Sequence, residues 1–293
     1  MIKLNGIEIK SQKFNNGETY IDLPSSILST VKSFGCYNLF FKFESNQEIW
    51  DLMQIVDRIK QSSTNRIKLF MPYCVYSRMD RQENDRLFSL KTFANLINSM
   101  GFESVTILEP HSDVAPALID RIIVKNVSRV MVSNALKDLN VFDDHAQMEF
   151  KKICLVWPDC GSDKRYSKQF NYRHTITVGK ERDFDTGYLN PKYIFGAENE
   201  QDCEIAIIVD DIASSGKTFM MAAEKLRENL PNLKKIILCV AHCENTIQYQ
   251  KMFDTGLIDA MYTTDSILDT KVINHPKMHV YPCEAYMGGD NSI

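Results

Sequence analysis

The sequence contains no long hydrophobic run and no basic tract. No stretch approaches the roughly 18 apolar residues that a membrane helix needs, and the first residues show no hydrophobic core of a signal peptide. The formal net charge is -4, and lysines and arginines are neither clustered nor interleaved with aromatic residues. We therefore expect a cytoplasmic protein that binds neither membranes nor nucleic acid.

The eight cysteines show no pattern typical of a metal centre. Several of them, such as Cys154 and Cys203, lie in or beside apolar segments, where cytosolic proteins bury reduced thiols. The segment Cys239-Val240-Ala241-His242-Cys243 resembles half of a zinc site, but no second cluster completes it. We expect buried thiols and no structural zinc.

Glycine is also missing at one telling position. The pair Gly216-Lys217 suggests a P-loop, but that motif needs another glycine five residues earlier, where this chain has Asp211. A P-loop is therefore not the favoured reading of this segment. A surface turn with two solvated aspartates and no ligand is the alternative interpretation, and this segment alone does not exclude it.

The chain does contain a regular alternation of strand-like and helix-like segments. Its 293 residues, 44% of them hydrophobic, suit one large or two ordinary domains. Short apolar runs alternate with stretches of helical periodicity such as 46–60, which predicts an α/β fold of mostly parallel sheets flanked by helices. This alternation of strands and helices repeats along the chain, so we expect two similar halves, 1–145 and 146–293, with the site in the cleft between them. The segment before Gly196 has few apolar residues and no period, which predicts a loop.

Polar side chains follow the predicted strands of both halves. Ligands of such sheets bind at the carboxyl ends of the strands, so these residues are candidates for an active site. They are Arg78, Asp80, Arg81, His111, Asp159, Lys180, Arg182, Asp210, Asp211 and Thr264.

The most informative segment is 205–218. A buried β-branched run leads into Asp210 and Asp211, and a loop of small residues then opens a helix. Backbone N–H groups at such a turn favour an anion, Lys217 can add positive charge, and hydroxyl groups can donate to phosphate. The carboxylates suit sugar hydroxyls or magnesium. The segment therefore predicts a ribose phosphate site formed by Asp210, Asp211, Ser214, Ser215, Gly216, Lys217 and Thr218.

Taken in order, the motifs resemble those of ribose-phosphate diphosphokinases (phosphoribosyl-pyrophosphate synthetases) over nearly the whole chain. The resemblance implies two phosphoribosyltransferase-like halves, with ATP bound mainly by the first. The matching segments are Phe14-Asn15-Asn16-Gly17-Glu18, the helix that follows Asn46, Pro72 to Arg81, His111, Pro158-Asp159-Cys160-Gly161, Lys180-Glu181-Arg182 and the loop that begins at Asp210.

The chain also departs from the family pattern. Asn16 replaces an aspartate and Met79 a glutamine, both in elements that the family uses around ATP. Ser214 replaces an aspartate in the ribose-phosphate loop, where 215–218 replace Thr-Gly-Gly-Thr. Glu109-Pro110 stands where the family has Asp-Leu. These changes bear on the nucleotide and the acceptor more than on the reaction class.

The resemblance implies Mg²⁺-dependent transfer of the diphosphoryl group of ATP to ribose 5-phosphate in nucleotide biosynthesis, with AMP as the second product. Lys180 and Arg182 are then catalytic, and His111 and Asp159 hold the metal. It also implies a homo-oligomer with the ATP site near a subunit interface. The implied ATP-binding residues are Phe14, Asn16, Glu18, Arg78, Met79, Asp80 and His111.

Other functions stay open from the sequence. The same chemistry could act on a 5-substituted ribose such as ADP-ribose, because the changed loop carries the additional charge of Lys217. A phosphoribosyltransferase would use the same loop but would not need the segments around Arg78 and Lys180. A non-catalytic regulatory homologue would be expected to lose Lys180 and Arg182, which this chain retains.

Overall fold

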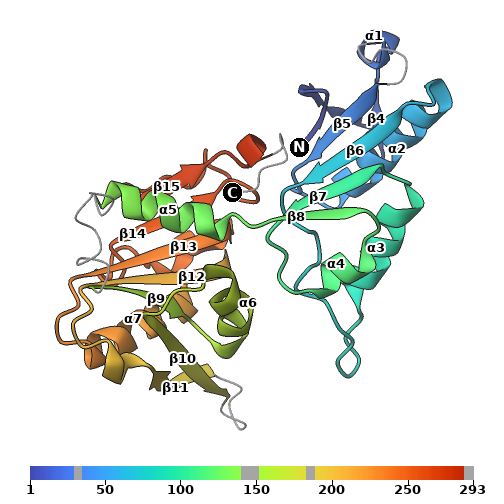
Figure 1. Ribbon diagram of the computed structural model, residues 1–293. Helices are drawn as coiled ribbons and strands as arrows, with labels where there is room; N and C mark the ends of the chain where they lie inside the picture. Colours follow the sequence, from blue (N-terminus) through green and yellow to red (C-terminus); the bar gives the residue numbers. More distant parts are fainter. Residues whose placement is uncertain (30–34, 140–151, 183–188, 287–293) are drawn as a thin grey trace. The chain divides into compact units, whose positions relative to one another are not determined.

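The computed structural model describes residues 1–29, 35–139, 152–182 and 189–286 (Figure 1). Contacts within the chain define two compact units, each of which is described by itself. The first comprises Met1–Lys125 together with the described residues from Cys283 onward, and the second comprises Asn126–Pro282. In the described residues, no helix has both the length and the apolar character needed to span a membrane.

The first unit contains a six-stranded sheet with the order β2-β1-β5-β6-β7-β8. Strands β5 to β8 are parallel, whereas β1 pairs antiparallel with both β2 and β5. The bounds are β1 Ile2–Leu4, β2 Ile7–Ile9, β5 Cys36–Phe41, β6 Arg66–Met71, β7 Ser104–Leu108 and β8 Ile122–Lys125.

One face of this sheet packs against α2 (Gln47–Ser62) and α3 (Ser89–Ser99). Side chains of a strand alternate between its two faces, so Leu39 and Leu69 join the core beneath these helices. Phe40 and Phe70 stack on the other face with ring centroids 5.7 Å apart. The unit also contains α1 (Ser25–Leu28), α4 (Val114–Leu118) and a separate hairpin of β3 (Ser11–Lys13) and β4 (Thr19–Ile21).

The second unit contains a seven-stranded sheet with the order β11-β10-β9-β12-β13-β14-β15. All neighbouring pairs are parallel except β10 and β11, which form an antiparallel edge. The bounds are β9 Ile153–Trp157, β10 Thr175–Arg182, β11 Leu189–Phe195, β12 Ile205–Ala213, β13 Lys235–Cys243, β14 Ala260–Thr264 and β15 Met278–Tyr281.

Helices cover both faces of this second sheet. Helix α7 (Lys217–Asn229) shares a core with Ala206 and Ile208 of β12. Trp157 of β9 instead stacks on Tyr166 of α6 (Cys160–Phe170), with ring centroids 6.0 Å apart. Helix α5 (Ser128–Asp138) packs on β12, β13 and β14 (Figure 1). Short 3-10 helices are η2 (Ala197–Asn199), η3 (Asn245–Gln250) and, in the first unit, η4 (Cys283–Tyr286). The predicted α/β architecture of mostly parallel, helix-flanked sheets is confirmed.

Two features differ from the expectation drawn from sequence. The units divide between Lys125 and Asn126 instead of at 145/146, because α5 packs on the second sheet. The chain then returns to the first unit at its end, where Glu284 forms an ion pair with Lys3.

The segment Leu189–Phe195 is a strand and not the predicted loop. It pairs with β10, so that Thr177 lies opposite Phe195 and Lys180 opposite Pro191. An edge strand tolerates proline and exposed side chains. This tolerance explains why its sequence lacks the apolar pattern of a buried strand.

Gly196 ends β11 in a conformation that other residues adopt only with strain, and this generates a stability prediction. Its φ is +88°, and an added Cβ would lie 2.6 Å from the carbonyl oxygen of Thr175. Gly256 has φ +71° but open space around its Cβ position. Gly256→Ala should therefore cost only the backbone strain of about 1–2 kcal/mol. Gly196→Ala should cost clearly more, because the backbone of β10 must also move.

Denaturant titration of both variants provides the comparison, since both glycines lie in the second unit. Equal losses in the free energy of unfolding would show that the contact with Thr175 does not constrain this turn.

Candidate active site

Carboxylates gather at the carboxyl ends of the adjacent strands β9 and β12. Parallel pairing aligns Val156 with Ile208, so the residues that follow in each strand lie close together. Asp159 caps the amino end of α6, and its Oδ1 accepts a hydrogen bond from the backbone N–H of Ser162 at 2.9 Å. Asp210 lies near the end of β12 and is half-buried.

Ser162 bridges these two carboxylates. Its Oγ lies 2.8 Å from Oδ1 of Asp210 and 3.1 Å from Oδ1 of Asp159. A hydroxyl has one hydrogen and can donate to only one carboxylate at a time. Because the backbone N–H of Ser162 already holds Asp159, its hydroxyl can donate to Asp210, and the buried serine contacts both acidic groups.

Burial raises the pKa of Asp210 well above its ordinary value, and the negative charges of Asp211 and Asp159 raise it further. The hydrogen bond from Ser162 acts in the opposite direction and lowers it. The site thus opposes ionisation of this carboxyl until a positive charge or a donor arrives.

Asp211 has a different environment from its neighbour. Its side chain is only 5% exposed, and Oδ1 forms an ion pair with Nη1 of Arg165 at 2.8 Å. Arg165 lies on α6 three residues after Ser162, so one helical face carries both partners of the carboxylate pair. Neither Ser162 nor Arg165 was among the residues predicted from the sequence. Their spacing after Asp159 was the signal that could have revealed them.

The predicted anion loop directly follows these carboxylates. Ser214, Ser215 and Gly216 join β12 to α7, and Lys217 and Thr218 are the first residues of the helix. The first N–H groups of a helix lack partners within the helix and favour an anion. Lys217 is exposed, whereas Ser215 and Thr218 are half-buried.

Gly216 is required by both conformation and space. Its φ is +81°, and an added Cβ would lie 2.9 Å from Sδ of Met252 and 3.2 Å from Cδ1 of Ile247. The loop is therefore held closely against the segment that follows β13.

Ser214 does not match the other predicted phosphate donors. Its Oγ donates a hydrogen bond to Oε2 of Glu244 at 2.5 Å. The hydroxyl is thus used within the protein, and Glu244 is a residue of this region that the sequence analysis did not identify.

Lys180 and Arg182 lie on the last part of β10. That strand pairs with β9 only as far as Thr177 and continues with β11 as an antiparallel hairpin. The register shifts between Gly179 and Lys180. The backbone therefore carries both predicted catalytic residues beyond the main body of the sheet, and residues 183–188 lie outside the described part of the chain.

The predicted turn around Phe14 lies in the first unit. It joins β3 to β4, and the N–H of Phe14 donates to the carbonyl of Glu18 at 2.8 Å. Phe14 is 55% exposed and packs only 4.6 Å from the ring of Tyr20, centroid to centroid. Nδ2 of Asn16 donates to Oε2 of Glu18 at 2.7 Å. The hairpin therefore presents an exposed aromatic ring and a carboxylate next to an amide.

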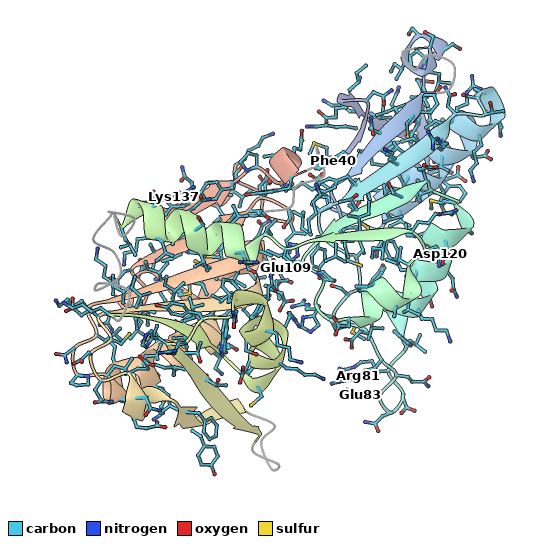
Figure 2. The ribbon with its side chains drawn as sticks, viewed as in Figure 1. Phe40, Arg81, Glu83, Glu109, Asp120 and Lys137 are labelled. Atoms are coloured by element: carbon cyan, nitrogen blue, oxygen red, sulfur yellow. The ribbon has the colours of Figure 1, made fainter. Side chains whose placement is uncertain are left out.

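The predicted ATP-phosphate segment follows β6. Arg78 is exposed, while Met79 and Asp80 are half-buried. Nε of Arg81 forms an ion pair with Oε1 of Glu83 at 2.7 Å, and Figure 2 shows both side chains on the loop that extends from the end of this strand.

His111 and Asp159 are the two predicted metal ligands, and they lie in different units. His111 is half-buried in the turn after β7. Across the ranges that the structure describes, no three His, Cys, Asp or Glu side chains converge as a ready metal site. Mg²⁺ commonly takes one or two carboxylates and completes its shell with water and substrate phosphates. The oxygen donors of Asp159 and Asp210 fit such a metal.

Comparisons with known proteins confirm the resemblance. A family model described as the N-terminal domain of ribose phosphate pyrophosphokinase matches residues 1–101. The ribose-phosphate pyrophosphokinase of Sulfurisphaera tokodaii is 25% identical over 268 residues, which cover 89% of this chain and 85% of that protein. The enzyme of that name from Thermosipho africanus is 28% identical over 226 residues, covering 76% and 67%. The one from Mycoplasma pneumoniae is 25% identical over 285 residues, covering 93% and 80%.

A solved structure supports the fold. The crystal structure of phosphoribosylpyrophosphate synthetase from Mycobacterium smegmatis superimposes with a TM-score of 0.72. The superposition covers 96% of this chain and 87% of that chain at 17% sequence identity. The two-unit α/β architecture is therefore shared over nearly the whole length.

The raised pKa of Asp210 generates a prediction on stability and pH. A carboxyl whose pKa is higher in the folded state contributes stability below its unfolded pKa of about 4. That contribution is lost as the pH rises through the folded value. Asp210→Asn, which is neutral at every pH, should therefore unfold at a higher temperature than the wild type at pH 7. Its advantage should shrink as the pH falls.

Thermal unfolding from pH 5 to pH 8 measures this difference. The exposed carboxylate Asp202, changed to asparagine, provides the control and should track the wild type. A less stable Asp210→Asn variant at pH 7 would contradict the account of this site.

Proposed function

We propose that the protein is a ribose-phosphate diphosphokinase, which transfers the diphosphoryl group of ATP to the anomeric hydroxyl of ribose 5-phosphate. The products are phosphoribosyl pyrophosphate and AMP. One observation carries the proposal: Asp210 and Asp211 lie near the carboxyl end of β12, and the glycine-containing loop that opens α7 follows the strand. A single strand end thus offers acceptors for sugar hydroxyls beside donors for a phosphate.

The proposed reaction breaks one bond and forms one. The anomeric oxygen attacks the β-phosphorus of ATP, and the bond from this phosphorus to the oxygen shared with the α-phosphate breaks. AMP leaves with that oxygen, and the proton of the anomeric hydroxyl passes to solvent. Such transfers need alignment and charge neutralisation more than covalent help.

The second unit would hold the acceptor. Asp210 accepts hydrogen bonds from ribose hydroxyls, and Arg165 keeps the adjacent Asp211 paired and fixed. The loop 214–218 receives the 5-phosphate through backbone N–H groups, Ser215, Lys217 and Thr218. In this proposal Lys180 and Arg182 stabilise the charge that develops on the transferring phosphates.

Mg²⁺, when bound, would neutralise charge on the transferred phosphates. Asp159 would hold it from the amino end of α6, where the hydrogen bond from the N–H of Ser162 fixes the carboxylate. The resemblance also assigns His111 to the metal. These assignments follow the resemblance and the oxygen-rich chemistry of the donors.

The first unit would bind ATP. The exposed ring of Phe14 suits stacking on adenine, beside Asn16 and Glu18 in the same turn. Arg78 is an exposed cation for the phosphates, with Met79 and Asp80 next to it. We propose that a homo-oligomer brings the hairpin of Phe14 to a neighbouring subunit.

All eight cysteines are free thiols, which fits a reducing cytoplasm.

One observation supports ADP-ribose as a second candidate acceptor. The exposed Lys217 at the first position of α7 supplies a positive charge that a second phosphate could use. Ribose 5-phosphate is favoured because a terminal phosphate alone can fill the short loop.

The proposal predicts that the wild-type protein releases AMP from ATP and Mg²⁺ when ribose 5-phosphate is supplied. Mass spectrometry should show the sugar phosphate gaining two phosphate groups, and EDTA should stop the reaction. A parallel incubation with ADP-ribose tests the second acceptor. If only ADP-ribose gains two phosphates, the favoured acceptor is wrong. If neither acceptor yields AMP, the protein is not a diphosphokinase.

A second prediction concerns the hairpin of β10 and β11. Lys180→Ala and Arg182→Ala should each lower kcat by roughly 10²-fold or more, because removal of a transition-state contact lowers turnover. Lys234→Ala removes an exposed cation before β13 and serves as the control. Turnover close to that of the wild type in both hairpin variants would exclude the catalytic role of this strand.

A further inference from the structure

The anion loop is fastened to the segment that follows β13 by a cluster of polar side chains. Oγ of Ser214 donates to Oε2 of Glu244 at 2.5 Å. Oγ1 of Thr246 donates to the same carboxylate oxygen at 3.1 Å and lies 3.3 Å from Oγ of Ser214. All three residues are half-buried, so these bonds are partly shielded from water. The backbone N–H of Glu244 also donates to the carbonyl of Ala213 at 2.8 Å.

An apolar contact ties the same two segments together independently. Gly216 leaves no room for a Cβ, which would lie 2.9 Å from Met252 and 3.2 Å from Ile247, and both of these side chains are buried. The residues 244–252 therefore support the loop at its first residue through hydrogen bonds and at its glycine through packing.

The presence of a carboxylate here calls for an explanation. Glu244 places a negative charge beside a loop whose proposed ligand is a phosphate, and like charges repel. A hydrogen bond to an ionised acceptor is, however, stronger than one between neutral groups. Glu244 is therefore favourable for phosphate binding if the free energy gained by ordering the loop exceeds the free energy lost to repulsion.

We propose that Glu244 is a positioning residue for the phosphate of the acceptor. It holds Ser214 through the side-chain hydrogen bond and thereby fixes the start of the loop 214–218 before the ligand arrives. Ser214 then acts through Glu244 and not as a direct donor to phosphate. This inference rests on the proposed function, because it assigns a support to the same acceptor site.

The consequence is a preformed anion loop. A loop that is ordered in the free protein does not lose further conformational freedom when it binds its ligand. Removal of the anchor should therefore weaken binding of the acceptor more than it slows the transfer step. It should raise KM and leave kcat less affected.

Two substitutions of Glu244 separate its hydrogen bond from its charge. Glu244→Gln keeps an acceptor oxygen and removes the negative charge, so the dissociation constant of ribose 5-phosphate should stay within threefold or decrease. Glu244→Ala removes the anchor, and the dissociation constant should rise about tenfold. Ser214→Ala removes the hydrogen bond from the loop but leaves the bond between Thr246 and Glu244, and it should also raise the dissociation constant. The double variant should be no weaker than Glu244→Ala alone, because Glu244→Ala already removes the bond to Ser214.

Titration calorimetry of the full chain with ribose 5-phosphate alone provides the main measurement, and steady-state kinetics provide the split between KM and kcat. Glu228→Gln removes an equal charge from the exposed surface of α7 and is the matched control. Thermal unfolding of every variant checks the fold. If Glu244→Ala does not fold, Ser214→Ala still tests the anchor while leaving the carboxylate in place.

An unchanged dissociation constant in Ser214→Ala would overturn the proposal. Equal weakening by Glu244→Gln and Glu244→Ala would also overturn it, because the acceptor oxygen that Gln keeps would then not support the loop. The binding measurement needs no turnover. A wild type that binds ribose 5-phosphate without releasing AMP would therefore refute the diphosphokinase proposal and leave the role of Glu244 intact.

Discussion

The ion pair between Arg165 and Asp211 is the interaction on which the second unit's site depends. Three carboxylates crowd the ends of β9 and β12, and a buried carboxylate without a partner is costly. Arg165 neutralises Asp211 from the adjacent helix at 2.8 Å, and Ser162 on the same helix contacts Asp159 and Asp210. One helical face thus holds all three acidic groups in place. Burial and the negative charges of Asp211 and Asp159 raise the pKa of Asp210, so this carboxyl resists ionisation.

The different contributions of neighbouring strand ends connect the fold to the proposed chemistry. Parallel pairing of β9, β12 and β13 brings the ends of three strands together, and each end contributes a different element. β9 leads to Asp159, β12 leads to Asp210 and the anion loop, and β13 leads to Glu244. An acidic group such as Asp210, which opposes folding at neutral pH, is expected where a site is organised for a ligand and not for stability. The elements that support the loop, Gly216 and Glu244, are instead satisfied within the protein.

The sequence was most informative where local pattern and burial agree. The strand at 205–213, the carboxylates near its end and the helix from Lys217 follow from hydrophobic pattern and turn chemistry alone. The edge strand β11 could not be predicted in this way. It pairs with β10 on one side only, so its hydrophobic pattern is weak. The unit boundary was misplaced because α5 follows the first sheet in sequence but packs on the second. Arg165, Ser162 and Glu244 were missed because their roles depend on contacts between segments far apart in the sequence.

The most direct test of this account is a crystal structure of the protein with ribose 5-phosphate. We expect the phosphate within hydrogen-bond distance of the backbone N–H groups of residues 215–218, and the ribose hydroxyls at Asp210. Ser214 should keep its bond to Glu244 in that complex. Density for the sugar phosphate elsewhere, for example in the depression of the first unit lined by Arg58, Lys60 and Arg66, would contradict the account.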